Sequence, residues 1–489
     1  MAVYLSVRND FFNYFYFAFA IEEKEREPYN VYKGDDFMKI RTDFTEGHIL
    51  RQLIVFILPL IATTVLQQLF NTADMIIVRW FVSDTAYAAV GSTGTIVGLF
   101  IELFLGFSIG ANVTIAKFVG EKNAEQISKG VHTALTLALF GGLLFGGIGL
   151  LATEPLLRLT NVPPELLAEA TLYLKIYFIG LPIYLLYNFA AAVFRSVGKN
   201  RIPLFCLTVG GVLNVALNLL FTAVWHLGVA GVALATVLSN AVSLCLLVGI
   251  LSRESEDIRF SFRKCKPDGR ILRSILRIGL PSGLLGSVFS ISNLCMQTAI
   301  NSLGTKMIAA SSSASNIEIY VQYPGNAFAQ ACTTMIGQCY GARKWQRCKK
   351  IFFTALSVCM GTTLLISSGV YFSAPVILRI FTDDPEVISL ALERMRFTLL
   401  CKCLQSAMDI SVGVTQGYGK TTVPAIFSLV GACGLRLLWI FSIFPCHPTV
   451  TVLFMIYPIT WLITSTANLI YYFFIQHRIT NLKAQGAAL

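Results

Sequence analysis

The sequence is poor in charge, because Asp, Glu, Lys and Arg make up only 13% of its 489 residues. Soluble domains contain about 25%. Here 55% of the residues are hydrophobic and the mean hydropathy is +0.67. This composition excludes an ordinary soluble protein and predicts an integral membrane protein. Short segments of alternating hydrophobicity are also missing, which excludes a transmembrane barrel.

Motifs for enzymatic chemistry are missing as well. No P-loop, HExxH or GxSxG pattern occurs, so nothing supports ATP hydrolysis or a common hydrolase mechanism. The five histidines lie near predicted helix ends, and the twelve cysteines form no CxxC pair or zinc-like cluster. We interpret the cysteines as small packing residues. We therefore expect a protein that is not an enzyme and has no cofactor and no resident metal, apart from a coupling Na⁺.

Twelve apolar segments are long enough to cross a bilayer. They cover 53–81, 86–114, 131–153, 166–193, 203–225, 228–251, 275–300, 307–337, 351–372, 387–415, 423–444 and 449–475. Basic residues gather in alternate loops, at 195–201, 253–277 and 343–350, whereas the intervening loops are mixed or acidic. This positive-inside pattern places both termini in the cytoplasm of a multi-pass cell-membrane protein. The net charge of +11 therefore reports topology and not a nucleic-acid partner.

An internal repeat divides the chain into two halves. Arg158, Pro164 and Glu165 recur 221 residues later as Arg379, Pro385 and Glu386, and Gly120 recurs as Gly341. Six helices per half give both halves the same orientation, so we expect an all-α fold with a pseudo-twofold axis along the membrane normal. Substrate should bind between the halves near the midplane. The predicted parts are an N-lobe over 51–251, a cytoplasmic linker over 252–272, a C-lobe over 273–475 and a cytoplasmic tail over 476–489.

Residues 1–50 form a cytoplasmic segment that does not match the rest of the chain. The aromatic run at 11–21 is too short to span a membrane, and no cleavage-site pattern follows it. Met38 begins an ordinary lead-in to the first membrane helix. We expect 1–37 to be an extended start that insertion and transport do not need. The alternative is an aromatic segment that lies in the membrane interface.

Asp74 lies inside the first apolar segment. Three polar side chains, Thr63, Gln67 and Asn71, precede it at helical spacing and so share its face. An acid at membrane depth costs several kcal/mol unless it is neutralised, paired or hydrated. We favour a proton or cation site, and the alternative is a structural acid bonded to neighbouring helices.

The fifth and sixth segments carry further polar residues. Asn214 and Asn218 are four residues apart, as are Thr236 and Asn240, so each pair shares a helix face. Together with Asp74, their oxygens suit a dehydrated Na⁺ or a network switched by a proton. The alternative for the Asn pair is hydrogen bonding that holds helices together.

The second half contains a polar stripe in its eighth segment. Its members are four residues apart: Glu318, Gln322, Asn326 and Gln330. Asp409 lies in the tenth segment and Arg436 in the eleventh. Because an unpaired arginine in lipid is costly, we expect Arg436 to pair with Asp409 or Glu318. The interior charges should then be largely acidic, with Glu102 as a further candidate of lower rank.

Seven motifs in this order resemble the multidrug and toxic compound extrusion (MATE) family, over about residues 51–472. They are PLIATTVLQQLFNTAD, IAKFVGEKN, FRSVGKNRIP, LNVALN, GVAGVALAT, IGQCYGARK and YPITW. The resemblance implies a twelve-helix secondary transporter. It would export organic compounds, cationic or amphipathic drugs among them, by alternating access in exchange for Na⁺ or H⁺.

The resemblance also implies site residues. The family's first-lobe cation site maps onto Asp74, Asn214, Asn218 and Thr236. Many members have aspartate at the position of Asn218, which leaves the coupling ion open. The candidates for the substrate cavity are Gln67, Asn71, Glu318, Gln322, Asn326, Asp409 and Arg436.

Two other functions stay open. A flippase of lipid-linked oligosaccharides belongs to the same wider superfamily, but such proteins line their cavity with basic residues, whereas acidic ones are expected here. A membrane-embedded enzyme or receptor is a remote alternative. As partners we expect small molecules and membrane lipids, no nucleic acid, and a monomeric state.

Overall fold

The computed structural model describes residues 42–160, 162–261 and 266–484, which are helical and contain no strand. The expectations for the start of the chain, 1–37, lie outside the described residues.

The first half contains six long helices. They are α2 (Ile49–Phe81), α3 (Asp84–Gly120), α4 (Ala124–Leu159), α5 (Pro164–Ser196), α6 (Arg201–Leu219) with the π-helical turn η2 (Leu220–Val224), and α7 (Gly228–Leu251).

The second half repeats this order with more breaks. Its elements are α8 (Gly269–Ser302), α9 (Thr305–Gly341), α10 (Trp345–Ile377) with η4 (Leu378–Ile380), α11 (Pro385–Thr398), α12 (Lys402–Gly417), α13 (Thr422–Ser428), η5 (Leu429–Gly434), α14 (Leu435–Ser442), η6 (Phe444–Cys446) and α15 (Val450–Ala484).

These elements correspond to the twelve predicted segments. Within the described ranges, ten helices are long and apolar enough to span a membrane, and α11 with α12 form an eleventh span bent by 42°. The remaining helix is α9, which is 37 residues long and carries the polar stripe. Two of the predicted segments need correction. The tenth, 387–415, is broken between α11 and α12, and the twelfth does not end at residue 475, because α15 continues to Ala484.

Side-chain caps fix where several helices begin outside the membrane. Ser83 accepts a hydrogen bond from the Ala86 amide at 2.9 Å at the start of α3. Asp268 accepts from the Ile271 and Arg270 amides at the start of α8, and the Ile271 hydrogen bond is the main reason why the pKa of its carboxyl group is lowered. These caps satisfy amides that the first helical turn leaves unpaired.

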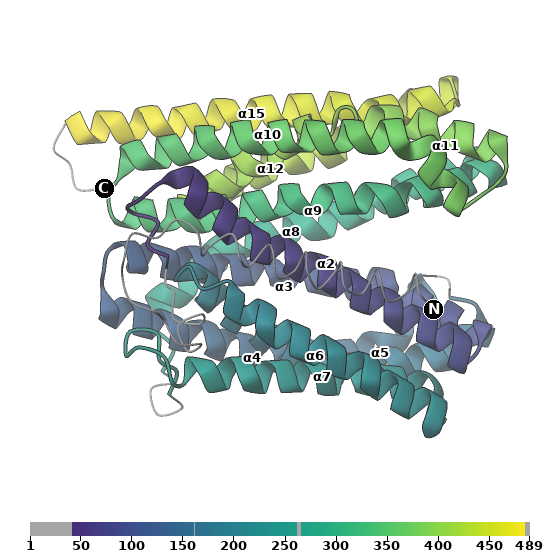
Figure 1. Ribbon diagram of the computed structural model, residues 1–489, viewed down its shortest axis with the longest axis horizontal. Coiled ribbons are helices and arrows are strands. Elements are labelled where there is room, and N and C mark those ends of the chain that lie inside the picture. Colours follow the sequence, from purple (N-terminus) through teal and green to yellow (C-terminus); the bar gives the residue numbers. More distant parts are fainter. Residues whose placement is uncertain (1–41, 161, 262–265, 485–489) are drawn as a thin grey trace, which may run out of the picture. The chain divides into compact units, whose positions relative to one another are not determined.

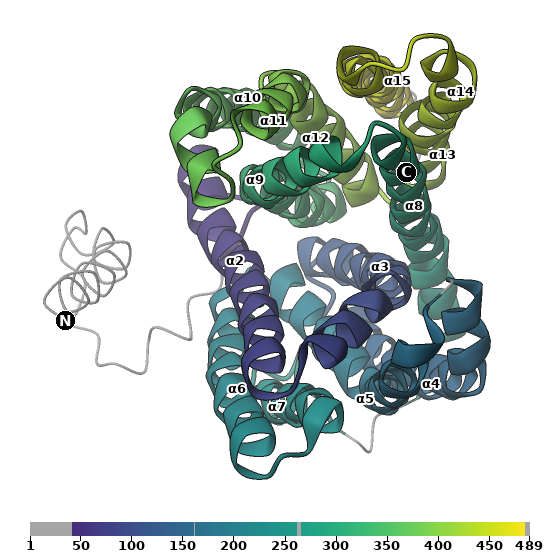
Figure 2. The same cartoon turned by 90° about the vertical axis from the view of Figure 1, so that its right-hand side faces the viewer.

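Helices of the two halves form two groups (Figure 1). Helices α4–α7 lie together on the N-lobe side, and α10–α12 lie with α15 on the C-lobe side. Figure 2 shows α2 and α8, the first helix of each half, at opposite edges of the bundle, where each runs across the boundary between the groups. The two lobes therefore meet along α2, α3, α8 and α9.

Glycines permit the closest contacts between the lobes. A Cβ on Gly120 of α3 would overlap the Gln338 carbonyl oxygen of α9, and one on Gly341 of α9 would overlap the Lys117 carbonyl oxygen of α3. Gly120 and Gly341 are the pair that the 221-residue repeat relates. The repeat thus produces a reciprocal crossing at the end of the bundle that carries the basic loops, which we call the basic end.

Hydrogen bonds reinforce this crossing. The Gln338 side chain accepts from the Phe44 amide at 3.2 Å and donates to the Ser196 carbonyl at 2.7 Å. About two helical turns from the glycine crossing, Asn112 donates to Thr334 at 2.9 Å between α3 and α9. These contacts join the lobes at the basic end and leave the structure closed there.

Candidate functional site

Asp74 of α2 contacts the amide of Asn218 on α6. Asn218 Nδ2 donates to Asp74 Oδ1 at 2.6 Å, and Asn218 is fully buried while Asp74 is half-buried. A hydrogen bond to a charged group is worth about 1.5–3 kcal/mol. The pair therefore holds the acid at a defined place on the inner face of the N-lobe.

Two further residues extend this contact. Asn218 Nδ2 lies 3.4 Å from Asn214 Oδ1, and Asn214 Nδ2 lies 3.4 Å from Thr236 Oγ1. The Thr236 side chain is also within hydrogen-bonding reach of Asp74. The structure thus brings together the residues predicted for the cation site. We call Asp74, Asn214, Asn218 and Thr236 the N-lobe centre.

The donor set of the N-lobe centre fits a hard cation. The buried Asn218 Oδ1 has no hydrogen-bond partner among the described residues, which leaves its lone pairs free. A carboxylate, two amide oxygens and a hydroxyl are ligands that Na⁺ accepts. A proton bound to Asp74 would neutralise the same carboxylate and would not need the other three oxygens as ligands. The centre can therefore take either ion.

A π-helical turn adjoins the N-lobe centre. The turn η2 (Leu220–Val224) begins two residues after Asn218, and the Thr222 hydroxyl donates to the Asn218 carbonyl at 2.6 Å. Such turns change the direction of neighbouring side chains and are frequent at functional sites. The sequence gives no periodic signal for this turn.

The other predicted residues of α2 lie apart from these hydrogen bonds. The Thr63 hydroxyl donates to the Pro59 carbonyl at 2.7 Å within α2. Gln67 is half-buried and Asn71 is exposed, and neither side chain makes a hydrogen bond within the described ranges. Gln68, which was not predicted, accepts from Tyr323 Oη of α9 at 3.1 Å and so links the two lobes.

Glu318 of α9 forms an ion pair that the sequence did not indicate. Its carboxylate accepts from Arg394 Nη2 of α11 at 2.9 Å and from the Thr398 hydroxyl at 2.5 Å. Arg394 also donates to the Ser311 carbonyl at 3.0 Å. The predicted pairing of Arg436 with Glu318 is therefore wrong, because Arg394 occupies that carboxylate.

Lys402 begins α12, directly after the break that follows Thr398. Its ammonium group donates to Gln322 Oε1 at 3.4 Å and is close enough to Asp409 and Glu318 to interact with both charges. Asp409 is half-buried and has no cation within 4 Å among the described residues. Asn326 is half-buried and makes no side-chain hydrogen bond there.

Arg436 of α14 faces an aromatic ring instead of an acid. Its guanidinium carbon lies 4.3 Å from the centroid of the Tyr457 ring of α15. The predicted pairing with Asp409 is thus also wrong. Arg394, Lys402 and Arg436 are all more than nine-tenths buried. The C-lobe interior therefore holds three cations against two carboxyl groups, which corrects the expectation of a largely acidic interior.

Glu102 does not join either group of residues. It is exposed on α3, where its side chain lies against Gly286 of α8. We use the name C-lobe centre for five residues: Glu318, Arg394, Lys402, Asp409 and Arg436.

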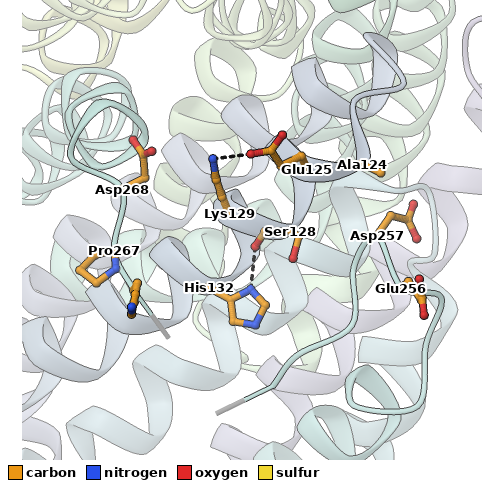
Figure 3. Close-up of a pocket in the computed structure, with 10 residues that line it drawn as sticks. Ala124, Glu125, Ser128, Lys129, His132, Glu256, Asp257, Pro267 and Asp268 are labelled. Carbon is orange, nitrogen blue, oxygen red and sulfur yellow. Dashed lines mark hydrogen bonds and ion pairs between the residues drawn. The ribbon is translucent and has the colours of Figure 1, made fainter. Parts of the chain in front are cut away.

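A cavity of about 680 Å³ lies away from both centres, between the start of α4 and the linker (Figure 3). Glu125 pairs there with Lys129 at 2.6 Å, and His132 Nδ1 contacts the Ser128 carbonyl at 2.7 Å. Its lining residues come from the basic end and not from membrane depth. We therefore do not assign the transport site to this cavity.

Comparison with known proteins gives a consistent result. The family model MatE matches twice, over residues 59–220 and 281–442. The chain is 27% identical over 396 residues to the probable multidrug resistance protein YoeA of Bacillus subtilis, which covers 79% of this chain and 85% of that protein. It is 22% identical over 412 residues to the multidrug export protein MepA of Staphylococcus saprophyticus, covering 80% of this chain and 90% of that protein. The crystal structure of MATE in the bent conformation superimposes with a TM-score of 0.83 at 23% identity, covering 91% of this chain and 98% of that one.

Proposed function

Because the chain belongs to the MatE family of multi-pass membrane transporters, we propose that it exports organic compounds in exchange for Na⁺ or H⁺. The observation that carries this proposal is the N-lobe centre, where Asp74 lies at membrane depth beside three neutral oxygen ligands. An acid in such a place stays there only when a cation, a proton or a partner offsets its charge.

The chemistry of the N-lobe centre suits coupling. A bound cation would be held by the Asp74 carboxylate and by the side-chain oxygens of Asn214, Asn218 and Thr236. A bound cation would neutralise the negative charge of Asp74 and would accept the free lone pair of Asn218 Oδ1. Because α2, which carries Asp74, also contacts the C-lobe through Gln68 and Tyr323, loading can favour one arrangement of the lobes over the other. Ion entry and substrate exit then depend on the same equilibrium.

The closed basic end gives this mechanism a direction. The positive-inside pattern assigns the basic end to the cytoplasm. With α3 and α9 crossing at Gly120 and Gly341 and hydrogen bonds joining the lobes there, we infer that the space between the lobes is closed to the cytoplasm. The arrangement supports an outward-facing state, which binds the coupling ion and releases the exported compound.

Labelling of single cysteines tests the orientation. In a cysteine-free background, a cysteine at Lys344 after α9 should react with an impermeant maleimide only from the cytoplasmic side, because that loop is basic. A cysteine at Asp384 before α11 should react only from outside. Both positions lie outside the helices. Reaction from the same side at both positions would contradict the assignment of spans.

Transport itself is tested with purified protein in liposomes. The liposomes are loaded with a fluorescent substrate, and a Na⁺ gradient and a pH gradient are imposed in separate experiments. We expect one of the two gradients to drive the substrate out of the lumen. Liposomes without a gradient provide the control. Efflux that is equal with and without both gradients would refute antiport.

Asn218→Asp should change the ion dependence of efflux. The new carboxylate would lie where Nδ2 is now, 2.6 Å from Asp74 Oδ1. Two carboxylates at this distance repel each other, so the pair should retain a proton or require a cation. We expect the curve of efflux against external pH to shift by roughly one pH unit or more. Asn301→Asp, at an exposed position near the end of α8, is the matched control. Identical curves for Asn218→Asp and wild type would contradict the assignment.

A second candidate is export of a lipid-linked anionic sugar. The three buried cations of the C-lobe favour it, since a flippase for such lipids needs basic residues in its interior. Translocation of a fluorescent lipid pyrophosphate between leaflets, measured beside efflux of soluble compounds in the same liposomes, separates the two functions.

A further inference from the structure

Arg436 is a buried cation without a counterion. It is 3% exposed, and its guanidinium group donates no hydrogen bond to any described residue. Burying a charge in this way costs several kcal/mol unless a partner is supplied. The five donors of an arginine form a planar fork that matches a carboxylate or a phosphate. The stacking on Tyr457 covers one face of the fork and leaves its donor edge free.

The charges of the C-lobe centre do not balance. Glu318 neutralises Arg394 through a direct ion pair at 2.9 Å. Asp409 interacts with the charge of Lys402, whereas Arg436 has only the Tyr457 ring, so one positive charge stays uncompensated. One bound anionic group would complete the balance. Glu318, Gln322 and Tyr457 are only half-buried, which gives the centre an accessible rim.

Aromatic rings line the same centre. Along α15, Phe454 lies 5.2 Å from the Arg394 guanidinium carbon, and Trp461 lies 5.6 Å from the Lys402 ammonium nitrogen. With Tyr457, each buried cation therefore faces one ring of α15. Cation–π contacts hold the cations in place without neutralising them. The rings also provide an apolar surface for an aromatic ligand.

The two lobes differ in polarity. The family model matches at an offset of 222 residues and the repeat holds at 221, so the position of Asp74 corresponds to Met296 or Cys295. The C-lobe thus has an uncharged residue where the N-lobe has its acid, and its own centre holds three buried cations. The charge of the C-lobe centre suits an anion, whereas the charge of the N-lobe centre suits a cation.

We propose that the C-lobe centre binds the anionic group, a carboxylate or a phosphate, of the exported compound, with Arg436 and Lys402 as its ligands and the α15 rings beside it. The substrate class is then aromatic anions or zwitterions, and not the simple organic cations expected from the sequence. This inference rests on the proposed function, because it names what the transporter carries. Binding and transport can be measured separately, so either can fail alone.

The test compares two probes that differ only in charge. Full-length protein in lipid nanodiscs is titrated with 1-pyrenebutyrate and with 1-pyrenebutylamine, and bound probe is followed by its fluorescence. We expect wild type to bind the anion at least about tenfold more tightly, and Arg436→Gln to lose about ten- to hundredfold of that affinity, because charge-assisted hydrogen bonds are removed. Arg396→Gln, an exposed arginine of the same lobe, should bind like wild type.

Several outcomes decide the proposal. Equal affinity for both probes in wild type, or an unchanged preference in Arg436→Gln, would overturn it. Thermal stabilisation by sodium chloride alone, without discrimination between the probes, would assign an inorganic anion and also overturn it. If Arg436→Gln does not fold, Lys402→Gln gives the same test. If the protein prefers the anionic probe but shows no gradient-driven efflux, the anion site is supported and antiport is refuted. If it shows gradient-driven efflux but no preference for the anionic probe, antiport is supported and the anion site is refuted.

Discussion

Asp74→Asn is expected to give a folded, membrane-inserted protein whose gradient-driven efflux falls to the level of empty liposomes. Asparagine retains the shape of the side chain and a contact to Asn218, which lies 2.6 Å away in wild type. It removes the charge that attracts the ion. Moving a two-state equilibrium from 1:99 to 99:1 requires about 5.5 kcal/mol of differential binding, and a neutral side chain cannot supply this for a cation. Binding of substrate should change less than efflux.

The control for this variant is Asp84→Asn. Asp84 begins α3, is exposed and pairs with Arg79 at 3.4 Å, so its charge is solvated. Exposed pairs contribute about 0–1 kcal/mol, and this variant should transport like wild type. With protein amounts matched, wild-type efflux by Asp74→Asn would refute the role of the N-lobe centre and direct attention to Glu318 and Asp409.

Gly120→Val should abolish efflux by a different route. The valine side chain would occupy the position of the Gln338 backbone, so α3 and α9 cannot cross as they do here. Because that backbone cannot move aside without shifting α9, the basic end should stay open. We expect a cysteine introduced at Gln67 to become accessible to an impermeant maleimide from the cytoplasmic side.

Gly147→Val provides the matched control, because a Cβ at Gly147 of α4 meets no atom within 4 Å. This variant should keep both efflux and the wild-type labelling pattern. Wild-type efflux by Gly120→Val would show that closure at the glycine crossing is not needed for transport.

Helical spacing indicated the polar residues of the N-lobe, and the resemblance to the MATE family then selected the four residues of the N-lobe centre. Asp74 stood out as an acid in an apolar segment, and the four-residue spacing of Asn214 and Asn218 put both on one face. The repeat also indicated Gly120 and Gly341 as a related pair, although not that they meet. Periodicity shows which residues share a face of one helix, but not which faces of two helices meet. The sequence analysis therefore named Gln67 and did not predict the contact of Gln68 with Tyr323.

The C-lobe was predicted less well for a physical reason. Arg394, Thr398 and Lys402 are spaced four apart and face Glu318 and Gln322, which are also four apart. That pattern was visible, but Asp409 was the one residue of the segment 387–415 that the sequence analysis singled out. The cost of an unpaired arginine in lipid predicts that Arg436 has a partner, but it does not predict that this partner is an acid. Tyr457 satisfies Arg436 in part through its ring, which spacing alone does not indicate.

Ion movement driven by substrate tests the central claim, coupling at Asp74, most directly. Liposomes containing the protein are given an outward or inward gradient of substrate and no ion gradient, while lumenal pH and ²²Na⁺ uptake are recorded. We expect wild type to move one of the two ions in the direction opposite to the substrate and Asp74→Asn to move neither. Equal ion movement by wild type and Asp74→Asn would contradict coupling at Asp74.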